Sequence, residues 1–361
     1  MGAVDGAGAG QRLAEGGGRA RDEGRRGARR RDRQDLVGRR MSVRRHAAPA
    51  DRAGGRYAAG RRAARRRGRR RYERCRHRRG NRRVQPDFTP SAASDEAAGP
   101  QPEKAQIGGR TMRFLKLGDG SGTPAVLIHG FGGDLNNWLF NHAELAAHRP
   151  VWALDLPGHG ESGKAVDTGS LDELADAVLA LLDVQQVDRA HLIGHSMGGA
   201  VAMAAAERAP ERVASLTLIA SAGLGAEINR DYIDGFVAGN SRNTLKPHLG
   251  ALFADSALVT RQLVDDLVKY KRLEGVQVAL EKIANAAFDG ATQRRVFRDR
   301  LASLAPRTLV IWGERDQVIP VQHARGLPDG VRTEVMAGSG HMVQMEAAAD
   351  VNRAIVAFLG G

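Results

Sequence analysis

The 361-residue sequence contains a single cysteine, Cys75, and only 4% aromatic residues. One cysteine cannot form an intramolecular disulfide, which argues against a disulfide-stapled secreted protein. No apolar run approaches the roughly 20 residues that a membrane-spanning helix needs, and the first residues lack the apolar stretch of a secretory signal. We therefore expect a cytoplasmic protein that does not bind a membrane.

Lysine is absent from the first 100 residues, which hold 29 arginines and 11 acidic residues and carry a net charge of +18. The remaining residues hold 26 basic and 30 acidic side chains, so the overall charge of +14 comes from the N-terminal part alone. Residues 1–84 have too few apolar side chains to offset the entropy of ordering, which predicts a disordered Arg-rich segment. Residues 85–105 are predicted to be a Pro/Ala linker, and residues 106–361 the folded domain.

Three interpretations of residues 1–84 are open. In the first, the segment is a solvated tail without a partner. In the second, it is an arm that binds the phosphates of a nucleic acid or another polyanion. We consider the second the weaker of these two. The third interpretation, which we favour, is a frameshift, because GC-rich coding DNA read out of frame gives lysine-free Arg/Gly/Ala text. Residues 1–6 and 31–36 can be encoded by codons that, when read in a frame shifted by one base, give amino-acid strings that look like parts of a lipoyl domain.

What the sequence does contain is a Gly-x-Ser-x-Gly turn, residues 194–198, between an apolar run and an alanine-rich stretch. Strand, tight turn and helix in this order are typical of a nucleophile elbow. The sharp turn projects the weakly nucleophilic serine hydroxyl towards a base, and the glycines let strand and helix approach each other. We therefore predict that Ser196 is the catalytic nucleophile.

Two further candidates follow late strands of the domain. Asp316 comes after the apolar run 308–312, and His341 comes after the strand predicted at 331–335. The order Ser, Asp, His and the position beyond the carboxyl ends of strands are those expected for a catalytic triad in a parallel sheet. His341 would take the proton of Ser196, and Asp316 would fix the tautomer of His341. Glu314, in the same loop, is the alternative to Asp316.

The glycine-rich turn 129–133 follows the apolar run 124–128 and predicts an oxyanion-binding loop. We expect the two donors to be the backbone N–H groups of Phe131 and Met197, while a purely structural turn is the alternative. His159 lies in the loop after the strand predicted at 151–156. It is a further candidate base, but we expect it to have a structural role.

Alternating strands and helices predict a doubly wound, mostly parallel sheet. Strand patterns stop between about 225 and 300, where helical spacing is found at 229–238, 260–273 and 275–288. Such an insertion typically covers the active site as a helical lid. The charged run 269–272 within it is interpreted as a solvated face, with binding of an anionic group as the alternative.

The sequence resembles the α/β-hydrolase family over residues 106–361. Within that family it is similar to the hydrolase-type domain of dihydrolipoamide acetyltransferase components of bacterial acetoin dehydrogenase complexes. The resemblance is carried by residues 127–138, 154–160, 194–200, 226–229 and 340–346.

The resemblance implies acetyl transfer from a dihydrolipoyl group to CoA, with other subunits of the acetoin dehydrogenase complex as partners. It implies neither a metal nor a cofactor bound by the hydrolase domain. The chain departs from the family in having no lipoyl-lysine candidate before Lys104 and no His-x-x-x-Asp-Gly acyltransferase signature. Ser196 would therefore have to carry the acetyl group, with the CoA thiol replacing water as the acceptor.

Two other functions use the same sequence features differently. A stand-alone hydrolase would act on esters, thioesters or C–C bonds of small carbonyl compounds with the same three residues. A polyanion-binding protein, the remote alternative, would work through the Arg-rich segment and would leave the hydrolase fold without a role.

Overall fold

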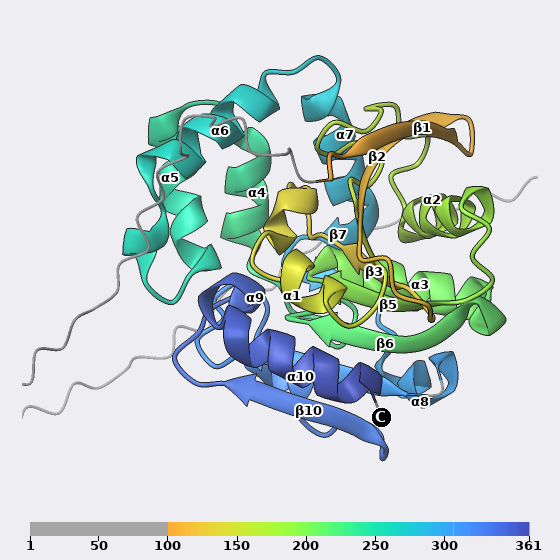
Figure 1. Ribbon diagram of the computed structural model, residues 1–361. Coiled ribbons are helices and arrows are strands. Elements are labelled where there is room, and N and C mark those ends of the chain that lie inside the picture. The colour runs from red at the N-terminus through yellow and green to blue at the C-terminus, as the bar shows by residue number, and fades with distance from the viewer. Residues whose placement is uncertain (1–99, 306, 361) are drawn as a thin grey trace, which may run out of the picture. The chain divides into compact units, whose positions relative to one another are not determined.

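The computed structural model describes residues 100–305 and 307–360 (Figure 1). The expectations for residues 1–84, and for the linker up to residue 99, lie outside the described residues. Within them, the chain forms an eight-stranded sheet in the order β1-β2-β4-β3-β5-β6-β9-β10. The strands are β1 (Glu103–Ile107), β2 (Arg110–Leu117), β3 (Ala125–Ile128), β4 (Val151–Leu154), β5 (Ala190–His195), β6 (Val213–Ile219), β9 (Thr308–Gly313) and β10 (Val331–Met336).

The sheet is mostly parallel, as predicted. Only β1 against β2 and β2 against β4 run antiparallel, and all other neighbours run parallel. Strands β3 and β4 are buried along their whole length, because helices cover both faces of a doubly wound sheet. The carboxyl ends of these parallel strands lie at one edge, which is where such sheets build their sites.

Two groups of helices cover the sheet. Helices α2 (Leu171–Val184), α3 (Met197–Arg208) and α8 (Leu301–Leu304) form one group, and α1 (His142–Ala146) packs on α10 (Ala348–Gly360) in the other. Figure 1 shows α3 and α10 on opposite sides of β6. A short helix, α9 (Val343–Glu346), leads from the last loop into α10.

The helical lid lies between β6 and β9 in the chain and consists of α4 (Arg230–Ala238), α5 (Arg242–Leu249), α6 (Arg261–Lys271) and α7 (Val276–Ala287). The helices gather on one side of the molecule (Figure 1). The three helices predicted from spacing correspond to α4, α6 and α7, with bounds that differ by one or two residues. Side chains of Asn229, Ser241 and Thr260 cap α4, α5 and α6.

Several short or polar elements were not expected. Strand β1 begins at Glu103, within the end of the predicted linker, and only its last residue, Ile107, is buried. Helix α5 is polar and contains Pro247. The hairpin of β7 (Phe288–Asp289) and β8 (Thr292–Gln293) closes the lid segment.

The charged run 269–272 of α6 differs from the solvated face expected for it. Lys271 is buried, with 6% of its surface exposed, and its Nζ donates to the carbonyl oxygens of Phe236 and Val237, at 2.5 and 3.0 Å. These carbonyls belong to the last turn of α4, where a cation is favourable. The ammonium group therefore holds two lid helices together, and the interpretation as a solvated face is wrong for this residue.

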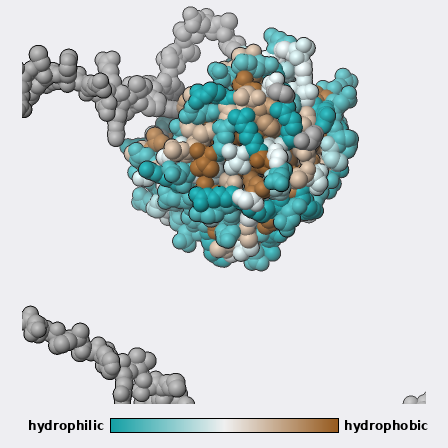
Figure 2. All heavy atoms as spheres, turned by 90° about the horizontal axis from the view of Figure 1, so that it is seen from below, coloured by the Kyte–Doolittle hydropathy of each residue, from teal (hydrophilic) through white to brown (hydrophobic). Residues whose placement is uncertain are grey.

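The surface is mixed in character. The face in Figure 2 is mainly hydrophilic, with hydrophobic residues in small separate groups. No helix within residues 100–305 and 307–360 is long and apolar enough to cross a membrane. In the same part of the chain, no cluster of three or more His, Cys, Asp or Glu side chains is arranged to hold a metal ion.

Candidate active site

Ser196 lies in a strained turn between β5 and α3. Its backbone angles are φ 53° and ψ −121°, a region that non-glycine residues rarely adopt and that is associated with functional sites. The flanking glycines are required by close approach. A Cβ atom on Gly194 would lie 2.3 Å from the carbonyl oxygen of Gly198, and one on Gly198 would lie 2.2 Å from that of Ile128. The turn therefore has the geometry expected of a nucleophile elbow.

His341 and Asp316 form a buried pair. The Nδ1 atom of His341 donates to the Oδ2 atom of Asp316 at 2.8 Å, and their side chains are 2% and 0% exposed. The other carboxylate oxygen accepts hydrogen bonds from the backbone N–H groups of Val318 and Ile319, at 2.8 and 3.0 Å. The carboxylate thus accepts three hydrogen bonds, one of them from the imidazole ring of His341.

Glu314 lies apart from this pair. Its side chain is exposed, and it accepts a hydrogen bond from the backbone N–H of Gly338 at 3.0 Å. Of the two carboxylates considered for the site, the structure thus places Asp316 against His341.

The loop that carries His341 docks on the residue before Ser196. The Nε2 atom of His195 donates to the carbonyl oxygen of His341 at 3.0 Å, and the two rings are 4.8 Å apart. Burial holds the pKa of His195 well below its usual range, so its ring is neutral. Sequence reasoning missed this contact, because nothing in the pattern pairs residues that lie 146 positions apart.

Glu346 braces the same loop. Its carboxylate accepts hydrogen bonds from the backbone N–H groups of Gly340 and Ala254, both at 2.9 Å. Burial raises the pKa of this carboxyl group. Ala254 belongs to the lid segment, so Glu346 joins the lid to the loop of His341. The stretch 340–346 carries part of the family resemblance, but sequence reasoning gave Glu346 no role.

The predicted oxyanion loop lies directly against the serine. A Cβ atom on Gly130 would lie 3.0 Å from both the Cβ atom of Ser196 and the Nδ1 atom of His195. Met197 is the first residue of α3, so its N–H has no acceptor within the helix. Among the described residues, the N–H of Phe131 has no backbone acceptor either. Both predicted donors are thus uncommitted beside the serine.

Aromatic contacts join the oxyanion loop to the lid. The ring of Phe131 lies 5.7 Å from that of Phe236 in α4 and 6.2 Å from that of Phe288. Gly132, at φ +72°, leaves a niche for Phe236, because a Cβ atom there would lie 2.3 Å from two atoms of its ring. The lid helix is therefore seated on the loop that carries a predicted oxyanion donor.

Two further histidines are neutral and serve the loops around the site. His129 donates from Nδ1 to the carbonyl oxygen of Gly130 at 2.8 Å and accepts at Nε2 from the N–H of Leu156 at 3.0 Å. His159 is fully buried and donates from Nδ1 to the carbonyl oxygen of Pro157 at 3.1 Å. Burial lowers the pKa of His129 to about 4 and that of His159 to about 3. These contacts agree with the structural role expected for His159.

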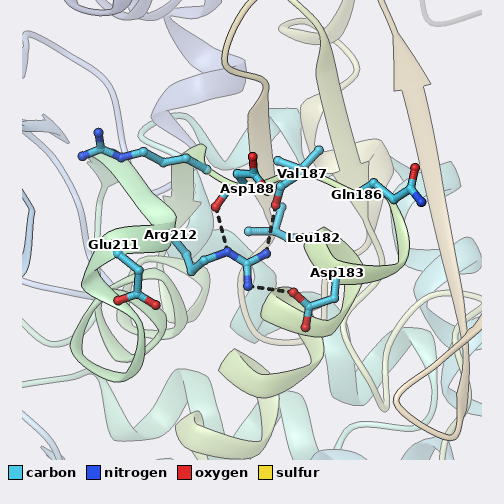
Figure 3. Close-up of a pocket in the computed structure, with 8 residues that line it drawn as sticks. Leu182, Asp183, Gln186, Val187, Asp188, Glu211 and Arg212 are labelled. Carbon is cyan, nitrogen blue, oxygen red and sulfur yellow. Dashed lines mark hydrogen bonds and ion pairs between the residues drawn. The ribbon is translucent and has the colours of Figure 1, made fainter.

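A surface depression of about 610 Å³ lies away from this site (Figure 3). It is lined by residues that precede β5 and β6, whereas Ser196 follows β5. Arg212 at its centre donates to the Asp183 carboxylate at 2.7 Å and to the carbonyl oxygens of Asp188 and Val187, at 2.7 and 2.9 Å. The guanidinium group is thus satisfied by the chain itself, and the depression is unrelated to the chemistry of Ser196.

Comparison with known proteins identifies the family. The alpha/beta hydrolase fold family matches residues 123–348. This chain belongs to the α/β-hydrolase family. The solved structures similar to this chain include a serine hydrolase from Cycloclasticus zankles, with a TM-score of 0.66, 22% identity and coverage of 73% of this chain and 99% of that one. A meta-cleavage product hydrolase from Pseudomonas fluorescens IP01 has a TM-score of 0.65 at 24% identity, with coverage of 72% and 97%. The predicted fold class is confirmed.

The curated relatives of this α/β-hydrolase share more sequence. It is 56% identical to the dihydrolipoyllysine-residue acetyltransferase component of the acetoin cleaving system of Pseudomonas putida, over 77% of this chain and 74% of that protein. It is 44% identical to the component of the same name from Cupriavidus necator, over 74% and 72%. It is 34% identical to 2-hydroxymuconate semialdehyde hydrolase from Pseudomonas sp. CF600, over 64% and 84%. The resemblance found in the sequence is thus confirmed, and its named relatives are enzymes.

Proposed function

We propose that this α/β-hydrolase is a serine acyltransferase that moves an acetyl group from a dihydrolipoyl thiol to CoA, as a component of an acetoin-cleaving complex. The observation that carries the proposal is the buried pair of His341 and Asp316, docked through His195 on the strained turn of Ser196. The two relatives named as acetyltransferase components of acetoin cleaving systems support the choice of acyl donor.

In the first half-reaction, the Oγ atom of Ser196 attacks the carbonyl carbon of the acetyl thioester, and the Nε2 atom of His341 takes the hydroxyl proton. The carbonyl oxygen becomes an oxyanion that the N–H groups of Phe131 and Met197 stabilise, each such donor contributing about 3–4 kcal/mol in comparable sites. The C–S bond then breaks, and His341 returns the proton to the sulfur. Asp316 stabilises the imidazolium form of His341 throughout.

In the second half-reaction, the thiol of CoA gives its proton to His341 and attacks the acetyl group on Ser196. The ester bond breaks, acetyl-CoA leaves, and the proton returns to the Oγ atom of Ser196. The dihydrolipoyl group and CoA both enter as substrates in this scheme, and the chemistry requires neither a metal nor a cofactor bound by the domain.

Hydrolysis is the second candidate function. Water replaces CoA in the second half-reaction and releases free acid. The relative named as 2-hydroxymuconate semialdehyde hydrolase, which this chain covers over 84% of its length, favours this candidate. The same residues would carry it, so the acceptor is what separates the two functions.

The proposal is tested by measuring how the acetyl group is divided between CoA and water as acceptors. The protein and its Ser196→Ala variant are given acetyl-dihydrolipoamide with CoA, and acetyl-CoA and free acetate are measured together. We expect acetyl-CoA from the wild type and a loss of at least about 10³-fold in the variant, because the nucleophile is gone. Thermal melting of both proteins controls for folding. Acetate in place of acetyl-CoA assigns the protein to the hydrolases, and turnover that persists without Ser196 overturns both candidates.

A further inference from the structure

Asn229 fastens the start of lid helix α4 to the loop that carries Asp316. Its backbone N–H donates to the carbonyl oxygen of Val318, and its Nδ2 atom donates to that of Gln317, both at 2.8 Å. Its Oδ1 atom accepts from the backbone N–H of Tyr232 at 3.0 Å and so caps the helix. One side chain thus fixes the first turn of α4, and Tyr232 in it, beside the Asp316 loop.

Tyr232 is buried, with 6% of its surface exposed. Within the part of the chain that the structure describes, no group forms a hydrogen bond with its hydroxyl. Burial and the nearby carboxylate of Asp316 raise the pKa of Tyr232, so the hydroxyl stays protonated and can donate. The hydroxyl oxygen is not among the fully buried side-chain atoms that lack a partner, so part of its surface stays accessible to water or to a ligand.

The tyrosine ring extends from the Asp316 loop towards the oxyanion side of the site. It lies 6.0 Å from the ring of Phe236, which in turn lies 5.7 Å from that of Phe131. Tyr232 therefore lies between the loop of the proposed proton-transfer pair and the loop of a proposed oxyanion donor.

We propose that the Tyr232 hydroxyl binds the free thiol of the acetyl-dihydrolipoyl donor by a hydrogen bond. This inference rests on the proposed function. The acetyl oxygen is bound by two backbone N–H groups, and the sulfur that bears the acetyl group receives its proton from His341, so both already have donors. The second sulfur of the dihydrolipoyl arm has none, and it belongs to the leaving group, which departs on the side of His341. Tyr232 thereby selects a dithiol donor over a simple thioester.

The test replaces Tyr232 by phenylalanine, which removes only the hydroxyl. Because that hydroxyl has no partner in the protein, the variant is expected to fold like the wild type. Two acyl donors are compared, acetyl-dihydrolipoamide and S-ethyl thioacetate, which lacks the second thiol. We expect KM for acetyl-dihydrolipoamide to rise about fivefold to tenfold, the usual effect of one hydrogen bond, while the kinetics with S-ethyl thioacetate stay the same.

Binding is measured separately by using dihydrolipoamide to inhibit turnover of S-ethyl thioacetate. We expect the inhibition constant to rise in Tyr232→Phe by the same factor as KM. Tyr270→Phe is the matched control, because this second lid tyrosine donates from its hydroxyl to the carbonyl oxygen of Gly158 at 3.2 Å. The control should lower thermal stability and should not discriminate between the two donors.

The outcomes separate the inference from the function on which it rests. If dihydrolipoamide inhibits the wild type and Tyr232→Phe equally, the role of Tyr232 is overturned while the proposed function stands. If Tyr232→Phe raises KM for both acyl donors by the same factor, the effect of the substitution is structural and the inference is overturned as well. If dihydrolipoamide does not inhibit the wild type, the proposed donor is wrong, and the inference fails with it.

Discussion

Two carboxylates lie in the loop after β9, and they make different contacts. Asp316 is held by two backbone N–H groups and by His341, whereas Glu314 is exposed. Asp316→Asn should lower kcat by about 10⁴-fold, because an amide favours the wrong tautomer of the histidine. Glu314→Gln should leave kcat unchanged, since its amide oxygen can still accept from Gly338. Steady-state kinetics of both variants with acetyl-dihydrolipoamide and CoA check this, and equal losses would contradict the assignment.

At the same scale, the sequence predicts site residues whose positions follow from the order of strands along the chain. It does not predict residues whose place in the site follows from contacts between distant segments. The positions of Ser196, Asp316 and His341 could be predicted because each follows a strand, and parallel strands bring their carboxyl ends together; their catalytic roles stay predictions. The contacts of His195 and the unpaired hydroxyl of Tyr232 could not be predicted. Both are properties of the folded chain.

Helix α4 meets the oxyanion loop through the niche that Gly132 leaves for Phe236. Gly132→Ala combines a backbone penalty at φ +72° with a clash against that ring. Gly109→Ala is the matched control, because Gly109 has φ +78° and no atom within 4 Å of an added Cβ. Both variants should lose about 1–2 kcal/mol of unfolding free energy from the backbone alone, measured by urea denaturation.

Only Gly132→Ala should also lower kcat, because the displaced ring moves the lid relative to Phe131. A loss of about 10²-fold is expected for such a misplacement, with no loss in Gly109→Ala. Equal kcat values in the two variants would show that the lid does not hold the loop.

The elements that spacing predicted are those with a continuous apolar face. Helices α4, α6 and α7 have such a face, and strands β3 and β4 are apolar throughout. Helix α5 escaped prediction because it is polar, contains Pro247 and buries only Leu245 and Leu249. Strand β1 has one buried residue and depends on pairing with β2 for its structure. Tertiary contacts, which local patterns do not encode, stabilise both elements.

At the scale of the whole molecule, the fold buries histidines in a neutral state on several elements. Burial lowers the pKa of His129, His142 and His191 to about 4, from an ordinary value of 6.5. The positive charges of Arg149, Arg307 and Arg189 contribute at His191. These histidines lie on β3, α1 and β5 or next to them. A drop in pH is therefore expected to lower the stability of the whole domain and not only to affect the site.

The sign of the resulting pH dependence follows from linkage. Between pH 6.5 and about 4 the unfolded chain binds protons at these histidines and the folded chain does not. The contribution of the neutral histidines to the free energy of unfolding is therefore complete above pH 6.5 and is lost as the pH drops towards 4.

His142→Leu should reduce the slope of the free energy of unfolding against pH, because His142 alone accounts for up to about 3 kcal/mol over this window. Urea denaturation from pH 8 to pH 4.5 measures the slope, with the exposed His148→Gln as the control. A wild-type stability that does not change between pH 7 and pH 5 would contradict the neutral state of these histidines, and a His142→Leu slope equal to that of the control would exclude His142 from it.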